Sequence, residues 1–250
     1  MSISSNISYV QASWNPWQGC DKVSDGCKNC YMYREKNRYG QDPMTVIKSK
    51  PSTFNAPLTW AKNGKLPAGS RIFVCSWSDF FHEDADPWRQ EAWKIIEQLP
   101  QYDFLIPTKR TERIIDCLPY FEDGTGFMPD NVWLGASVEN QEMFDKRIED
   151  LLEAPAKIHW LSVEPMLGPI DFHFPPYLND GTDTWIVLGG ESGPGCRPCD
   201  PEWIRDAVEQ CMEVQIPVFV KQLGGWPDTR SNMEDFPEDL QIRAYPIKEN

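Results

Sequence analysis

Three cysteines that lie close together in the chain, Cys20, Cys27 and Cys30, have the residue type and the spacing of a metal-binding loop. Three thiolates leave a four-coordinate site one ligand short, whereas a structural zinc site normally has four protein ligands. A cubane [4Fe–4S] cluster held by three cysteines keeps one iron open for a small molecule, and its iron prefers sulfur ligands. The spacing therefore favours an iron–sulfur cluster. Free or buried thiols are the alternative for an isolated Cys-x-x-Cys pair.

The residues before Cys20 favour the cluster over free thiols. Trp14, Pro16, Trp17 and Gly19 lead into the first cysteine, and together they describe a tight, shielded loop. An iron–sulfur cluster needs such shielding, because the apolar surroundings of a metal site control its access to solvent.

The elements that must position this loop follow from the hydrophobic pattern, which alternates short apolar runs with amphipathic segments from Arg71 onwards. The predicted strands are residues 7–13, 71–77, 103–107, 132–137, 158–163, 185–189 and 218–221. The predicted helices are residues 27–39, 86–99, 111–121, 140–152 and 202–214, with Asp86-Pro87 and Asp200-Pro201 as N-cap and first helical residue. Residues 40–70 contain frequent Gly, Pro, Asn and Ser and are expected to be irregular.

Near-continuous apolar strands at intervals of about 25–30 residues indicate repeated βαβ crossovers and a parallel sheet covered on both faces. We therefore predict an α/β fold, a full or partial TIM-type (β/α) barrel with about six or seven parallel strands. A doubly wound open sheet is the alternative. We expect one domain over residues 1–250, with the cysteine loop and irregular segment in residues 1–70 and a C-terminal tail in residues 226–250.

Polar residues follow each of the six predicted strands from Arg71 onwards. The carboxyl ends of parallel strands meet at one mouth, where α/β folds place their sites. A helix N-cap or a loop explains any one of these residues, but a run of six polar strand ends indicates a functional site. The candidates are Ser76, Ser78, Asp79, Lys109, Ser137, Glu139, Glu164, Gly189, Gly190, Glu191 and Lys221.

The other cysteines and the histidines give weaker signals. Cys196 and Cys199 form a second short pair without partner ligands, so whether they bind a second metal is open. The remaining cysteines lie in apolar contexts and are expected to be core thiols. The three histidines show neither a zinc-type nor a catalytic-triad spacing.

Composition and charge bound the class of protein. The chain is 40% hydrophobic and 12% aromatic, which is enough for a large core. It contains no apolar run of about 20 residues and no signal-peptide pattern, so we expect a cytoplasmic protein without a membrane partner. The net charge of −14 argues against a general nucleic-acid coat protein. Residues 1–70, however, carry a net charge of +5, and such a basic end suits nucleic acid or an acidic partner.

With cysteines after the first strand and a polar barrel mouth, the chain resembles the radical S-adenosylmethionine (SAM) enzymes. More closely, it is similar to a phage-associated family with a three-cysteine motif. The matching blocks run in order over most of residues 10–225: Trp14-Asn-Pro-Trp17, Gly19-Cys20, Cys27, Cys30-Tyr31, residues 78–82, Thr108-Lys109-Arg110, residues 133–140, residues 162–165, residues 189–194 and Lys221-Gln222.

The resemblance implies a [4Fe–4S] cluster on Cys20, Cys27 and Cys30. The amine and carboxylate of SAM would chelate its open iron, and one-electron reduction would cleave SAM to methionine and a 5′-deoxyadenosyl radical, which abstracts hydrogen from the substrate. The spacing departs from the usual Cys-x3-Cys-x2-Cys pattern, because six residues separate Cys20 from Cys27. Asn29 also stands where an aromatic residue is usual.

The resemblance also implies roles for the strand ends. Ser76, Ser78 and Asp79 would meet the SAM amino group, and Ser137 and Glu139 would meet the ribose. Gly189, Gly190 and Glu191 complete the implied cofactor-binding set. The implied catalytic residues, left for contacts with substrate or with a carboxylate, are Lys109, Glu164 and Lys221.

The implied activity is modification of a nucleic-acid base or its substituent, for example isomerisation of an amino-acid-modified thymine in phage DNA. The implied partners are an electron donor such as flavodoxin or ferredoxin, and DNA or a modified nucleotide. A phage-encoded protein would act in the cytoplasm of the host cell. The alternative is a zinc- or iron–sulfur-binding partner protein without catalysis.

Overall fold

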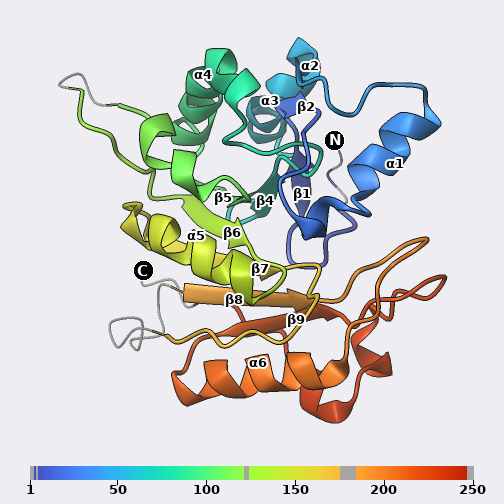
Figure 1. Cartoon of the computed structure of the whole chain (residues 1–250). Coiled ribbons are helices and arrows are strands. Elements are labelled where there is room, and N and C mark those ends of the chain that lie inside the picture. Colours follow the sequence, from blue (N-terminus) through green and yellow to red (C-terminus); the bar gives the residue numbers. More distant parts are fainter. Residues whose placement is uncertain (1–2, 4, 121–123, 175–183, 247–250) are drawn as a thin grey trace.

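A computed structural model of the chain describes residues 3, 5–120, 124–174 and 184–246. Seven parallel strands form one sheet that curls into a partial barrel with helices outside it (Figure 1). Their order across the sheet is β1 (Ala12–Trp14), β4 (Arg71–Val74), β5 (Asp103–Thr108), β6 (Val132–Ser137), β7 (Ile158–Val163), β8 (Thr184–Gly189) and β9 (Val218–Gln222). This confirms the predicted α/β partial barrel.

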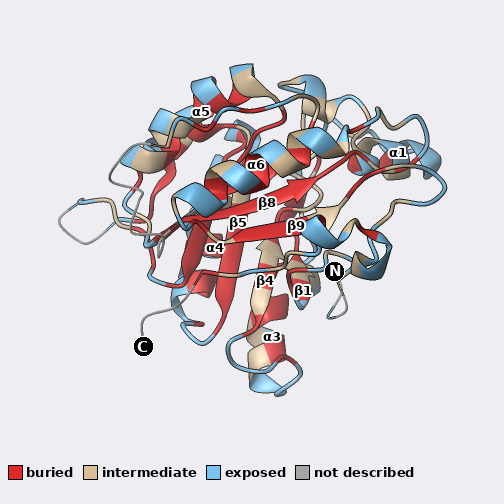
Figure 2. Cartoon of the chain, turned by 90° about the horizontal axis from the view of Figure 1, so that it is seen from below, coloured by how far each residue is buried: buried red, intermediate tan, exposed pale blue. Residues whose placement is uncertain are grey.

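Three longer helices pack against the outer face of the sheet: α4 (Asp86–Glu97), α5 (Gln141–Glu153) and α6 (Pro201–Glu213). In α5 and α6, the buried residues face the strands and the exposed residues face outward (Figure 2). Side-chain caps fix two helix starts, because Asn140 Oδ1 accepts from the Met143 N–H at 3.0 Å and Asp200 Oδ1 accepts from the Glu202 N–H at 3.0 Å.

The connection between β1 and β4 is more structured than its composition indicates. It contains α1 (Tyr31–Arg38), α2 (Pro51–Phe54) and α3 (Ala56–Lys62), and an antiparallel pair of β2 (Trp17–Gln18) with β3 (Ile47–Lys48). The prediction that residues 40–70 are irregular is therefore wrong in part. Buried Phe54 and Trp60 order the two short helices, because both side chains join the core outside the barrel.

Residues alternate along each strand between two cores. One set packs between the sheet and the helices, as Leu134, Leu161 and Ile186 do. The other set fills the barrel interior and is mainly aromatic: Tyr9, Phe73, Trp133, Trp160, Trp185, Phe219 and Tyr245. Gly135 makes room for this layer, because a Cβ on Gly135 would lie 2.5 Å from the Trp160 indole.

Toward the carboxyl ends of the strands, the residues that face the barrel interior change from aromatic to polar. On β6, Trp133 is followed two and four residues later by Gly135 and Ser137. On β7, Trp160 is followed by Ser162 and then by Glu164. Since every second residue of a strand faces the same side, the barrel has an aromatic floor and a polar mouth.

Several predicted boundaries are wrong. The helix over 111–121 is replaced by two 3₁₀ turns, Thr111–Arg113 and Ile115–Cys117, because Pro119 forces Leu118 into an extended conformation; residue 121 lies outside the described residues. The strand over 71–77 ends at Val74, because Cys75 has a φ of +60°. The strand over 7–13 is shorter and shifted, and α1 begins only after Cys30. Asp86 is the first residue of α4 and not its N-cap.

The described part of the C-terminal tail covers the free edge of β9. The Val220 N–H donates to the Ile242 carbonyl at 2.8 Å, and the Ala244 N–H donates to the Val218 carbonyl at 2.8 Å. This pairing satisfies an edge strand that would otherwise present unpaired backbone groups. Among the described residues, no helix is both long enough and apolar enough to cross a membrane.

Candidate active site

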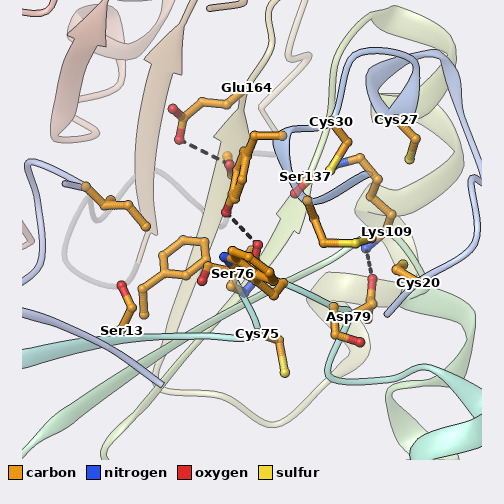
Figure 3. Close-up of a pocket in the computed structure, with 18 of the residues that line it drawn as sticks. Ser13, Cys20, Cys27, Cys30, Cys75, Ser76, Asp79, Lys109, Ser137 and Glu164 are labelled. Carbon is orange, nitrogen blue, oxygen red and sulfur yellow. Dashed lines mark hydrogen bonds between the residues drawn. The ribbon is translucent and has the colours of Figure 1, made fainter. Parts of the chain in front are cut away.

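A cavity of about 850 Å³ opens at the carboxyl ends of the strands. Its lining brings together ten of the residues singled out from the sequence: Cys20, Cys27, Cys30, Ser76, Ser78, Asp79, Lys109, Ser137, Glu164 and Lys221. Figure 3 shows the cysteines and Lys109 on one side of the cavity and Glu164 across from them. Glu139, Gly189, Gly190 and Glu191 do not belong to this lining.

The cysteine loop presents three half-buried thiols to the cavity. A single tetrahedral zinc ion would bring its sulfur ligands to about 3.8 Å from one another. Among the described residues, the one set of three ligand atoms within 4.8 Å of one another is that of Cys20, Asp21 and His82, so the three Sγ atoms are spread more widely. A cubane cluster places each cysteine on a different iron, and three spread thiols around a cavity fit such a group.

Glu139 anchors the middle of this loop. Its Oε1 accepts from the Gly26 N–H at 3.0 Å, and its Oε2 accepts from Arg147 Nη1 at 3.0 Å. The side chains of Glu139 and Arg147 are 0% and 2% exposed. Burial alone would raise the pKa of Glu139, but Lys109, the Ser24 hydroxyl and Arg147 together lower it. The carboxylate is therefore ionised and bound to the loop.

Glu191 holds the same loop at a second residue, Asn29. Its Oε2 accepts from Asn29 Nδ2 at 2.9 Å, and its carboxylate also accepts from the side chain and the backbone N–H of Arg197. Asn29 is thus a loop anchor at the position where the resemblance leads one to expect an aromatic residue. A cofactor-binding role for Glu139 and Glu191 stays a prediction, whereas their contacts with the loop are observed.

The serines and Asp79 after β4 are also engaged by the protein. Asp79 accepts from Thr108 Oγ1 at 2.7 Å and from the Lys109 N–H at 2.9 Å. Ser78 Oγ donates to the Gly19 carbonyl at 2.5 Å, and Ser76 Oγ bonds to the Asn15 side chain. These contacts fix the segment after β5 and the entry to the cysteine loop.

Arg110 and its acidic partners surround Cys20. Arg110 Nη1 lies 3.6 Å from Cys20 Sγ, and Nη2 lies 2.5 Å from Asp21 Oδ1. Burial and the Asp79 carboxylate raise the pKa of Cys20 to about 12, and Arg110 acts in the opposite direction. Arg110 was predicted only as part of the Thr108-Lys109-Arg110 block, because nothing local to it in the sequence indicates its contact with Cys20.

A second charged group lies across the cavity. Lys221 Nζ lies 2.5 Å from Glu164 Oε1, and the Tyr9 hydroxyl donates to Glu164 Oε2 at 3.1 Å. The Tyr9 ring packs edge-on against Trp185 at a centroid distance of 5.5 Å, so the hydroxyl stands at the top of the aromatic floor. Tyr9 was missed because it precedes β1 and no polar strand end marks it.

The other five cysteines form two groups, namely three buried core thiols and the pair of Cys196 and Cys199. Cys75, Cys117 and Cys211 are buried core thiols, as predicted, and Cys75 also lines the cavity. Cys196 is half-buried and Cys199 is buried. Within the described part of the chain, neither of the last two belongs to a set of three clustered ligand atoms.

The basic N-terminal region presents fewer free cations than its sequence indicates. Lys36 is 2% exposed, and Lys48 Nζ pairs with Glu91 at 2.6 Å. Arg34 lines the cavity and lies against Gly193, whose added Cβ would be 2.7 Å from Arg34 Nη1. Arg34, which also pairs with Glu35 at 3.7 Å, is thus a partly exposed cation at the rim of the site.

The chain belongs to the family described as "Protein of unknown function (DUF5131)", whose model matches residues 4–244. No curated protein matches the sequence. Among solved structures, one spore photoproduct lyase mutant is 15% identical with a TM-score of 0.45, covering 84% of this chain and 53% of that one. Another, with bound AdoMet and dinucleoside spore photoproduct, is 13% identical with a TM-score of 0.46, covering 94% and 63%. The matched part of this chain therefore spans about half the length of the first of these structures.

Proposed function

We propose that this protein is a radical SAM enzyme that holds a [4Fe–4S] cluster on Cys20, Cys27 and Cys30. One observation carries the proposal: the three thiols, two lysines and Glu164 line the same cavity at the mouth of the barrel. The cluster, when bound and reduced, supplies the electron that cleaves SAM to methionine and a 5′-deoxyadenosyl radical. The protein supplies the binding groups and the enclosure.

The charges in the cavity suit SAM. Its carboxylate needs a cation, and Lys109 and Lys221 both line the cavity. Its ammonium needs acceptors, for which we propose Ser76, Ser78 and Asp79. For the ribose we propose Ser137, which lines the cavity. Glu139 and Glu191 would support the cofactor indirectly, because they hold the cysteine loop through Gly26 and Asn29.

For the substrate we propose a nucleic-acid base or its substituent, for example an amino-acid-modified thymine in phage DNA that the enzyme isomerises. Lys109, Glu164 and Lys221 are the proposed catalytic residues, because they combine two cations and a carboxylate on the cavity wall. A cavity of about 850 Å³ is near the upper end of small-molecule sites, so it has room for more than one ligand group. Arg34 at the rim favours a phosphate-bearing substrate. The proposed electron donor is a flavodoxin or a ferredoxin.

A single-metal binding protein is the second candidate, because the ligand atoms of Cys20, Asp21 and His82 lie within 4.8 Å of one another. Anaerobic reconstitution with iron and sulfide separates the two functions. A radical SAM enzyme takes up four irons per chain, turns brown and cleaves SAM when reduced. A colourless chain that takes up one zinc ion supports the second candidate.

A further inference from the structure

The guanidinium of Arg110 is enclosed between a cysteine and two carboxylates. Arg110 is 5% exposed, and its Nη1 lies 3.6 Å from Cys20 Sγ and 3.5 Å from Asp79 Oδ2. Its Nη2 lies 2.5 Å from Asp21 Oδ1. A buried arginine with three such partners is fixed in orientation, because its planar donors match several acceptors at once.

His82 bonds to the same Asp21 carboxylate oxygen as Arg110. The His82 Nδ1 accepts from the Asp84 N–H at 3.2 Å, so the ring proton is on Nε2, which donates to Asp21 Oδ1 at 2.5 Å. His82 is 3% exposed. The contacts therefore form a connected series in which His82 fixes Asp21, Asp21 fixes Arg110, and Arg110 faces the sulfur of Cys20.

The same series disfavours a lone metal ion on Cys20, Asp21 and His82. Asp21 Oδ1 already accepts from two donors, and the Arg110 cation lies beside both Asp21 and Cys20. A metal cation in this position would lie close to a buried guanidinium, and the repulsion between the two positive charges would weaken its binding.

We propose that Arg110 is a positioning residue that orients the Cys20 thiolate and sets the reduction potential of the cluster; this inference rests on the proposed function. A cluster held by thiolates gains negative charge on reduction. A buried cation hydrogen-bonded to one of its sulfurs stabilises the reduced form, so hydrogen bonding and local charge raise the potential. Removing the cation makes the potential more negative.

The test compares Arg110→Gln and Arg110→Lys with the wild type in the reconstituted full chain. Iron per chain and the midpoint potential, from a redox titration followed by electron paramagnetic resonance, are the readouts. We expect a more negative potential for Arg110→Gln and a smaller shift for Arg110→Lys, which keeps the charge but loses the planar donors.

Arg113→Gln is the matched control. Arg113 Nη2 also lies 3.6 Å from a cysteine sulfur, that of Cys117, but Arg113 pairs with Asp86 away from the cavity. We expect its potential to equal that of the wild type. Where Arg110→Gln does not fold, Arg110→Lys alone carries the test, because it keeps a buried cation and is still expected to lower the potential through the loss of the planar donors.

A wild-type chain without iron overturns the proposed function and this inference together. A wild-type chain with four irons overturns this inference alone if Arg110→Gln keeps its potential. Where only Arg110→Lys folds, an unchanged potential in that variant has the same consequence.

Discussion

The backbone N–H of Gly26, the residue before Cys27, donates a 3.0 Å hydrogen bond to Glu139, two residues past the end of β6. Glu139 is fully buried and pairs with Arg147 of α5, so the cysteine loop is tied to the sheet and to a helix outside the sheet. The position of one proposed cluster ligand thus depends on an ion pair more than 100 residues away in sequence.

Gly26→Ala is expected to displace the loop. A Cβ at Gly26 would lie 3.0 Å from the Glu139 Cδ, and Glu139 cannot move because it is buried against Arg147. Iron content after reconstitution should therefore fall while the far-ultraviolet circular dichroism stays unchanged. Gly168→Ala is the control, since nothing lies within 4 Å of its added Cβ. Full iron in Gly26→Ala would show that the loop does not depend on this contact.

Glu139→Ala is expected to destabilise the protein by about 3–5 kcal/mol, because it leaves the buried Arg147 charge without its partner. Urea unfolding followed by fluorescence measures this loss. Asp130→Ala removes one partner of an exposed pair with Lys157, whose side chain is 64% exposed, and should cost less than about 1 kcal/mol. Equal losses in the two variants would contradict the structural role of Glu139.

Lys221→Met is expected to weaken SAM or substrate binding by about 10–100-fold, since a lost charged contact costs about 1.5–3 kcal/mol. Lys221 pairs with Glu164 at the cavity wall, and its removal also leaves that carboxylate less well held. Isothermal titration of the reconstituted protein with SAM, and then with substrate, separates the two ligands. Lys157→Met, at an exposed position, serves as the control. Unchanged affinity for both ligands would show that Lys221 contacts neither SAM nor substrate.

Cys196 and Cys199 should differ from each other in thiol reactivity, and the reactivity of Cys199 should depend strongly on pH. Burial raises the pKa of Cys199 to about 11, so at pH 8 only about a thousandth of this thiol is the reactive thiolate. Iodoacetamide labelling of the native protein, read by peptide mass spectrometry, should modify the half-buried Cys196 first. Labelling of Cys199 should rise as the pH approaches 11. Rapid labelling of native Cys199 at pH 8 would contradict its burial.

The strands and the mouth of the barrel were predictable, because both follow from local patterns. The strand β6 is buried along its whole length, and its apolar sequence shows this directly. The parallel topology then brings strand ends such as Ser137 and Glu164 to one cavity. The prediction of a helix over 111–121 was wrong because Pro119 holds Leu118 in an extended conformation.

The partners of the site residues were not predictable, because they join distant parts of the chain. Asn29 contacts Glu191, and Arg110 contacts Cys20, across sequence separations of 162 and 90 residues. Tyr9 meets Glu164 across 155 residues. A single sequence shows which residues end a strand, but it does not show which of them the fold turns toward the cysteine loop.

The most direct test of the central claim is anaerobic reconstitution of the wild-type chain, followed by reduction with dithionite in the presence of SAM. We predict four irons per chain and release of methionine and 5′-deoxyadenosine. Cys20→Ala, Cys27→Ala and Cys30→Ala should each lose both the iron and the products. Cys117→Ala and Cys211→Ala, at buried positions away from the cavity, should keep both. A colourless wild-type chain that leaves SAM intact, or full iron content in any of the first three variants, would contradict the proposal.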